Sequence, residues 1–369
     1  MHWLVRRSLF AALAGLGLLA AGGGLAAAPA VSPPTRPGTT TSAVAASRES
    51  LWSTVSIGKI DYVDASAFAA RFGLNFSWLD EGKRFQLKSA IVRFDFTVDS
   101  RESTINAQRV FLGDAVRQYK GRPHFSRIDV ERLLTPIAQP GWSGTRVPAF
   151  HTIVIDPGHG GEDIGTFNDH VKVVEKQATL DTALRLKQLL EADGYRVALT
   201  RTDDRKLELL ERPLVALQEK ADLFLSIHYN AVEKEAQQQS VSGVEVYVMT
   251  PQYQLSADLE RDNQVDVFNP GNAYDHWNAV LGFALHRELL RDLKVPDRGL
   301  KRGRRAVLRL APCPAVLVES GYLTQDAEAR KIATPAYRQK IAEAIADGVR
   351  AYAAILDGLR KKPAPDLPP

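Results

Sequence analysis

Three residues that could bind a metal ion or carry a proton stand where predicted strands end. His159 follows the β-branched run 153–155 and the break Pro157-Gly158, while His228 and Glu319 follow two further apolar runs of the kind that form buried strands. If these strands are parallel, their carboxyl ends lie at one edge of a sheet, which is where open α/β sheets bind ligands. The sequence therefore predicts that His159, His228 and Glu319 share one site.

A fourth residue, Glu175, lies in the first turn of a helix predicted over residues 173–192, at the same sheet edge. Two imidazoles and one carboxylate are a ligand set that catalytic zinc commonly takes, with the fourth position left to water. One carboxylate against Zn²⁺ leaves the site positive, which makes a bound water more acidic and polarises a carbonyl. We expect one zinc ion per chain, held by His159, Glu175 and His228, with Glu319 as the general base that then protonates a leaving nitrogen.

Each of these residues also has an ordinary structural explanation. The helix dipole alone favours a glutamate in a first turn, as at Glu175. A histidine after a strand is often a hydrogen-bonded surface group, and Glu319 by itself fits a loop. Three other histidines compete for a metal, although none ends a predicted strand: they are His170, His276 and His286. The pattern of residue types alone leaves both interpretations open.

Strands and helices alternate from His151 onward. The predicted strands cover 152–156, 196–200, 222–227, 244–249, 306–310 and 315–319, and the predicted helices cover 173–192, 207–220, 278–293 and 336–357. The pair Asp193-Gly194 is typical of a helix end. Such alternation indicates βαβ units. We therefore predict an α/β fold for residues 151–357, with a twisted, mostly parallel (mixed) sheet flanked by helices.

A smaller unit precedes this domain at residues 50–137. Apolar and polar residues alternate in several short runs, which predicts half-buried strands, and Asp64 and Ser126 are candidate helix N-caps. The unit resembles the copper amine oxidase N-terminal-like domain, which implies a small α+β domain and an envelope-binding module. The resemblance implies no copper here, because His124 alone is no metal site. Residues 138–149 are predicted to be a connector.

The first 28 residues have the three parts of a secretory signal. Arg6-Arg7 precede the apolar run 9–21, and the small residues 26–28 follow it. An uncleaved membrane anchor is the alternative, although the run is short and rich in Ala and Gly. Both the general secretory and the twin-arginine route fit the pair of arginines. We predict export to the periplasm or the extracellular cell envelope.

Composition excludes some classes of protein. The net charge of +4 comes without a Lys/Arg run interleaved with aromatic residues, so no nucleic-acid partner is expected. A single cysteine, Cys313, excludes an intrachain disulfide. Residues 29–48 are rich in Pro, Thr, Ser and Ala, and residues 360–369 are charged and proline-rich, so we predict a disordered linker and a disordered tail.

Short motifs stand in a fixed order in the second predicted domain. They are Ile155–Gly161, the isolated Glu175, Leu199–Arg201, Ser226–Ala231, Gly243–Tyr247, Asp297–Lys301 and Pro314–Leu323. Together they resemble the zinc-dependent N-acetylmuramoyl-L-alanine amidases of the amidase type 3 family. The resemblance implies that His159, Glu175 and His228 are the zinc ligands and that Glu319 is the catalytic glutamate. It also implies cleavage of the amide between N-acetylmuramic acid and L-alanine of peptidoglycan.

The sequence departs from this family pattern at three places. Tyr229 stands where the family usually has a small residue, which predicts a different pocket shape. Gln325 stands where the family usually has asparagine, in a turn beyond the site. The segment Thr250–Trp277 is long for a strand-to-helix connection, and loops of this length are functional or disordered. We expect a substrate-facing lid rather than a self-blocking helix.

The predicted function is that of an exported peptidoglycan hydrolase. Asn230 is a candidate for orienting the loop of His228 and Arg298 for meeting anionic substrate, although both also fit the scaffold. Peptidoglycan is the expected partner, contact with a membrane is expected only during export, and the sequence leaves a protein activator open. Two alternatives stay open: a non-catalytic cell-wall-binding protein, and a zinc carboxypeptidase acting within the stem peptide.

Overall fold

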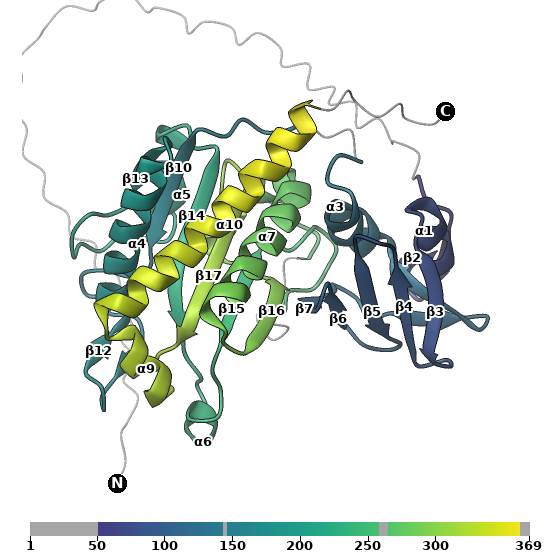
Figure 1. Cartoon of the computed structure of the whole chain (residues 1–369), viewed down its shortest axis with the longest axis horizontal. Coiled ribbons are helices and arrows are strands. Elements are labelled where there is room, and N and C mark those ends of the chain that lie inside the picture. Colours follow the sequence, from purple (N-terminus) through teal and green to yellow (C-terminus); the bar gives the residue numbers. More distant parts are fainter. Residues whose placement is uncertain (1–50, 143–145, 258–264, 362–369) are drawn as a thin grey trace, which may run out of the picture. The chain divides into compact units, whose positions relative to one another are not determined.

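The computed structural model describes residues 51–142, 146–257 and 265–361 (Figure 1). The predicted leader and linker lie outside the described residues. So does the predicted tail from residue 362 onward, whereas residues 360 and 361 belong to the last helix. Among the described residues, no helix combines the length and the apolar character that crossing a membrane requires.

The N-terminal part is rich in strands, as predicted. Its elements are β1 (Thr54–Ile57), β2 (Ile60–Asp64), α1 (Ala65–Arg71), β3 (Asn75–Asp80), β4 (Arg84–Lys88), β5 (Arg93–Thr97), β6 (Glu102–Ile105), β7 (Gln108–Phe111), β8 (Arg117–Tyr119), β9 (Arg122–Ser126), α2 (Arg127–Asp129), the π-helix η1 (Val130–Leu134) and α3 (Thr135–Ala138). Both predicted N-caps are confirmed, because the Asp64 side chain accepts from Ser66 N and the Ser126 hydroxyl accepts from Asp129 N.

The second part alternates strands and helices. Its elements are β10 (Thr152–Pro157), β11 (Phe167–Asn168), β12 (Val173–Val174), α4 (Glu175–Ala192), β13 (Arg196–Leu199), α5 (Glu211–Gln218), β14 (Leu223–Asn230), α6 (Glu235–Gln238), β15 (Val244–Val248), the 3₁₀ helix η3 (Pro270–Tyr274), α7 (Asp275–Leu293), β16 (Asp297–Arg302), α8 (Ala306–Arg309), β17 (Ala315–Tyr322), α9 (Asp326–Ile332) and α10 (Pro335–Lys361). Helix α4 ends before Gly194, whose φ is +90°, as the Asp193-Gly194 pair predicts.

One mixed sheet of 11 strands runs through most of the described chain, in the order β13-β10-β14-β17-β15-β16-β7-β6-β5-β4-β3. Strands β13, β10, β14 and β17 are parallel to one another, while β15 pairs antiparallel with β17. The predicted class, a twisted mixed sheet flanked by helices, is confirmed. The sheet continues into the N-terminal part, where Leu300 of β16 is the register partner of Val110 of β7.

Helices cover both faces of the central strands. Figure 1 shows α4, α10 and α7 side by side across one face, where they pack on β10, β14 and β15. On the other face, α5 and α8 contribute Ala216, Val307 and Leu308 to a second apolar cluster with Phe224 and Tyr247. Strand β10 is buried along its whole length, which explains its near-continuous apolar sequence. The carboxyl ends of β10, β14 and β17 are therefore held side by side at one edge.

One predicted strand is wrong, and one observed strand was not predicted. Residues 306–309 form helix α8 instead of a strand, because a short apolar run does not distinguish a buried strand from a single helical turn. Strand β16 was not expected, because Leu300 is its one large apolar residue. Its Gly299 has a φ of +101° and lies beside Phe111, where a Cβ would approach the ring within 2.6 Å. A glycine in a strand commonly marks such a close approach.

Asp275, the first residue of α7, provides a test of pH-dependent stability. Burial raises its pKa to about 7, although a hydrogen bond from Asn272 acts in the opposite direction. A carboxyl group with a higher pKa in the folded chain stabilises fully below its unfolded pKa of 3.8, and this contribution is lost as the pH rises through about 7. We expect Asp275→Asn to raise the free energy of unfolding at pH 8 by a few kcal/mol, on the order set by the shift, and to change it little at pH 4. Urea unfolding at both pH values tests this, and an equal effect at both would contradict it.

Candidate metal centre

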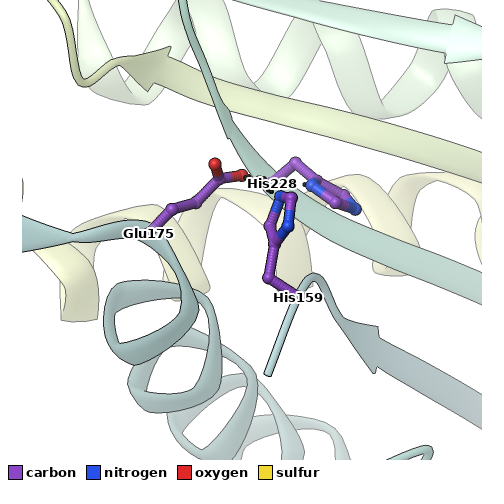
Figure 2. Close-up of side chains that lie close together, drawn as sticks. All are labelled: His159, Glu175 and His228. Carbon is purple, nitrogen blue, oxygen red and sulfur yellow. Dashed lines mark hydrogen bonds and ion pairs between the residues drawn. The ribbon is translucent and has the colours of Figure 1, made fainter. Parts of the chain in front are cut away.

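His159 reaches the site from a tight turn at the end of β10. Its backbone has a φ of +61°, a left-handed conformation that disfavours residues other than glycine. Nδ1 of the ring lies 2.9 Å from Oδ1 of Asp163. Nε2 lies 3.1 Å from Oε1 of Glu175, and Figure 2 shows these two side chains facing each other. Asp163 thus orients the imidazole so that Nε2 faces the other candidate ligands.

Glu175 lies at the centre of the site, as the first residue of α4, and its side chain is almost completely buried. Its Oε2 accepts a hydrogen bond from Thr166 N (2.8 Å) and its Oε1 accepts one from Tyr229 N (3.0 Å). Nδ1 of His228 lies 3.1 Å from the same Oε1. Two backbone donors therefore fix the position of this carboxylate.

The three side chains converge from three different elements, as Figure 2 shows. One nitrogen of His159, one nitrogen of His228 and one carboxylate oxygen of Glu175 lie within 4.8 Å of one another, and no other such group is found among the described residues. Two imidazole nitrogens and one carboxylate oxygen match the donor set of a catalytic zinc site. The fold thus brings together three predicted ligands that lie up to 69 positions apart in the sequence.

The charges within the cluster favour an ionised carboxylate. Burial by itself raises the pKa of Glu175, but the hydrogen bonds and charges of His228 and His159 outweigh it and hold the pKa below its usual range. Burial by itself lowers the pKa of His159. The hydrogen bonds and charges of Glu175 and Asp163 outweigh burial, so the pKa of His159 lies above its usual value. Glu175 is therefore negative at neutral pH, as a metal ligand must be.

Two glycines make room for the ligands. A Cβ on Gly158 would come within 2.3 Å of the His228 ring, and one on Gly165 would come within 2.6 Å of Oε2 of Glu175. The first glycine belongs to the Pro-Gly-His motif, whereas the second carries no signal in the sequence. Close approach of backbone to ligand is one of the reasons for which glycine is required.

Glu319 lies on β17 as the register partner of His228 on β14. Burial, followed by the charges of Glu175 and Glu245, raises its pKa well above the usual value. Its Oε2 is buried and has no hydrogen-bond partner among the described residues. A buried polar atom without a partner is unfavourable, so it indicates a position that a water molecule or a substrate would satisfy.

Asn230 and Arg298, the two candidates for positioning the His228 loop and the substrate, contact residues other than the three ligands. The Asn230 side chain donates to Glu245, and the Arg298 guanidinium lies 5.9 Å from the centre of the Tyr322 ring. The Tyr229 side chain is buried and its hydroxyl lies 2.7 Å from Thr182 Oγ1 on α4, so it packs against that helix. The expectation that Tyr229 reshapes the pocket is thus not supported by its position.

The competing histidines have other neighbours. His170 lies 2.9 Å from Asp326, His276 lies 2.7 Å from the carbonyl oxygen of Pro140, and His286 lies 3.0 Å from Asp297. These contacts belong to three separate parts of the fold. None of the three histidines belongs to the cluster of His159.

Sequence reasoning assigned no role to two charged residues next to Glu319. Glu245 is its antiparallel register partner on β15, and the ammonium group of Lys301 on β16 contacts the Glu245 carboxylate. Both residues stand in motifs of the fixed order, but their spacing does not say which side chains meet across strands. The pairing of β15 with β17 and β16 supplies that information.

These features define a class: an α/β protein with a candidate three-ligand metal site at the carboxyl edge of parallel strands. Comparison with known proteins narrows the class. Residues 153–351 match the model of the family described as N-acetylmuramoyl-L-alanine amidase, and the chain belongs to this family. The resemblance inferred from the motifs is confirmed.

The chain spans less than two thirds of the length of the relatives AmiC and LytC. The chain is 30% identical over 255 residues to N-acetylmuramoyl-L-alanine amidase AmiC of Escherichia coli, which covers 62% of this chain and 60% of that protein. It is 34% identical over 201 residues to the LytC amidase of Bacillus subtilis, covering 54% of this chain and 35% of LytC. The solved catalytic domain of the CwlV amidase from Bacillus (Paenibacillus) polymyxa is 29% identical, with a TM-score of 0.46, and covers 56% of this chain and 99% of that structure.

Proposed function

We propose that this protein is an exported zinc amidase that cleaves the bond between N-acetylmuramic acid and L-alanine in peptidoglycan. One observation carries the proposal: two imidazole nitrogens and a carboxylate oxygen lie within 4.8 Å of one another, and Glu319 stands on the adjacent strand opposite His228. The names of the relatives AmiC and LytC supply the bond that this chemistry would break.

In this proposal His159, Glu175 and His228 hold one zinc ion per chain. Zinc bound to three protein ligands polarises a carbonyl and makes water more acidic. Glu319, as an ionised carboxylate, takes a proton from the attacking water and delivers it to the leaving nitrogen. Glu175, ionised and fixed by the backbone N–H groups of Thr166 and Tyr229, holds the ligand geometry.

The parts outside the site have proposed roles as well. The division into a small domain over 50–137, a connector and a catalytic domain over 151–357 is part of the proposal, with the first domain as an envelope-binding module. Peptidoglycan is the proposed partner, and the proposed location is the periplasm or the extracellular envelope. Relatives named as probable cell wall amidases, such as LytH of Staphylococcus aureus, support this location.

Mass spectrometry of digested cell wall tests the reaction. Peptidoglycan is first cut into soluble fragments with a muramidase and is then incubated with the protein. We expect intact stem peptides with new L-alanine amino termini, together with sugars that have lost their peptides, because an amidase separates the two parts. Chelation of zinc should abolish the release, and added zinc should restore it.

The same experiment separates the two alternatives. Stem peptides shortened at their carboxyl ends, still attached to sugar, would indicate a zinc carboxypeptidase. Unchanged fragments in the presence of bound zinc would indicate a wall-binding protein without this activity. Undiminished release of peptides after complete removal of the metal would contradict the zinc mechanism.

A further inference from the structure

Two arginines are completely buried beneath the turn that carries His159. Arg201 is 0% exposed and stands two positions after the end of β13, while Arg212 is 2% exposed and is the second residue of α5. Burying a guanidinium group carries a free-energy penalty of several kcal/mol unless its charge and donors are satisfied. Their positions therefore call for a physical reason.

The donors of both arginines are directed at main-chain oxygens around the site. Arg201 donates from Nε to the carbonyl oxygen of Pro157 (3.0 Å) and from Nη2 to that of Gly158 (2.8 Å). Arg212 donates to the carbonyl oxygens of Pro157 (2.9 Å) and His159 (3.0 Å). The two side chains thus bind three consecutive carbonyl groups of one tight turn.

The same network reaches the second ligand-bearing segment. Nη2 of Arg201 also donates to the carbonyl oxygen of Lys176 (2.8 Å), the residue after Glu175, and to Thr179 Oγ1 (3.1 Å). The Thr179 hydroxyl in turn donates to the carbonyl oxygen of Gly158 (2.8 Å). Arg201 therefore links the turn of His159 directly to the first turn of α4.

A carboxylate below the turn fixes the second arginine. Oδ1 of Asp156 accepts from Arg212 Nη1 (2.8 Å) and from the Thr200 hydroxyl (2.6 Å), and Oδ2 accepts from the Ser226 hydroxyl (2.8 Å). Asp156 is 0% exposed and is the residue of β10 that stands three positions before His159. Arg212 is held from both sides, by Asp156 and by the turn itself.

Conformational strain explains why such a network is needed. The left-handed backbone of His159 is unfavourable by roughly 1–2 kcal/mol, and a turn of this kind relaxes unless its surroundings hold it. An apolar core residue could fill the space but could not bind several diverging carbonyl oxygens. The planar guanidinium with its five donors can, and a lysine ammonium cannot reproduce that fork.

We propose that Arg201 and Arg212 are positioning residues for the metal site, which hold His159 and Glu175 at ligand spacing before the ion binds. The inference rests on zinc binding by these residues, which is part of the proposed function. Because the arginines hold the ligands in place, zinc binding does not have to order the turn. The zinc affinity is therefore higher than it would be with a turn that is free to relax.

The inference is tested by measuring the zinc affinity of arginine variants of the full chain. Competition with a chelator of known affinity gives this value. We expect Arg201→Lys and Arg212→Lys to weaken zinc binding by about 10- to 100-fold, the usual effect of losing groups that orient ligands. Arg302→Lys is the matched control, because Arg302 is similarly buried and pairs with the buried Asp129 and Gln254 instead of with main-chain oxygens of the ligand-bearing segments. Its zinc affinity should stay within about twofold of the parent's, whatever its melting temperature.

The outcomes separate a positioning role from a general role in stability. Lower melting temperatures with unchanged zinc affinity in both site variants would overturn the inference. If the lysine variants do not fold, Thr179→Val removes the hydroxyl shared by Arg201 and Gly158 and should weaken zinc binding several-fold; parental affinity in this variant would also overturn it. If the parent binds zinc and the variants bind it with the same affinity, only this inference is contradicted. If the parent itself binds no zinc, the proposed function is contradicted.

Discussion

Replacement of Glu319 by glutamine is expected to slow peptidoglycan hydrolysis by about 10²- to 10⁴-fold while zinc remains bound, because a positioned general base contributes a factor of that size. The amide keeps the shape of the side chain but cannot accept the proton of the attacking water. Glu319→Ala should lose activity to a similar extent. Zinc is retained in both variants because the three ligand atoms come from other residues.

Release of stem peptides and zinc content per chain are the two measurements. Glu328→Gln is a suitable control, because Glu328 is also a buried glutamate and its carboxylate accepts from the backbone N–H groups of Gly243 and Tyr322. Glu328→Gln should lower the melting temperature but keep near-parental turnover at a temperature where the variant is folded. Near-parental hydrolysis by Glu319→Gln would remove Glu319 from the proposed mechanism.

That the candidate site residues come together could be predicted from the sequence, because their meeting depends on chain topology. His159 and Glu319 stand at the ends of apolar runs, and parallel strands bring such ends to one edge irrespective of the residues between them. The strands that carry them are buried, so their sequences are distinctly apolar. A helix that follows the first of these strands brings Glu175 to the same edge.

Other features depend on contacts between distant residues and leave no local pattern. Strand β16 is polar because one of its faces carries Lys301, whose partner Glu245 is 56 residues away, so its sequence does not resemble a buried strand. The continuation of the sheet into β7 rests on the pairing of Leu300 with Val110. Hydrophobic periodicity reports burial within one segment and carries no information on which edges pair.

The residues that support the site could not be predicted either, because their roles also depend on contacts between residues distant in sequence. Arg201 and Arg212 are charged, and charged residues are usually exposed, so a sequence pattern assigns them to the surface. Both are buried where they donate to the carbonyl groups of Pro157, Gly158 and His159, at the end of β10 and in the turn after it. Only the three-dimensional path of that turn shows that donors are needed there.

Replacement of His159 by alanine is expected to remove zinc and hydrolysis together, in contrast to the Glu319 variants. Structural zinc sites bind with roughly 10–16 kcal/mol over four ligands, so the loss of one ligand corresponds to about 2.5–4 kcal/mol, or roughly 10²- to 10³-fold in affinity. Zinc titration by chelator competition measures this change, with stem-peptide release followed in parallel.

His170→Ala is the control for this change, because His170 is an exposed histidine that contacts Asp326 and stands 11 positions further along the chain. It should keep parental zinc affinity and activity. The pair of phenotypes is what identifies the roles: a ligand variant that loses metal and turnover, beside a Glu319 variant that loses turnover alone. If His159→Ala bound zinc as tightly as the parent, the ion would have to lie elsewhere, and the proposed division of labour between three ligands and one base would be wrong.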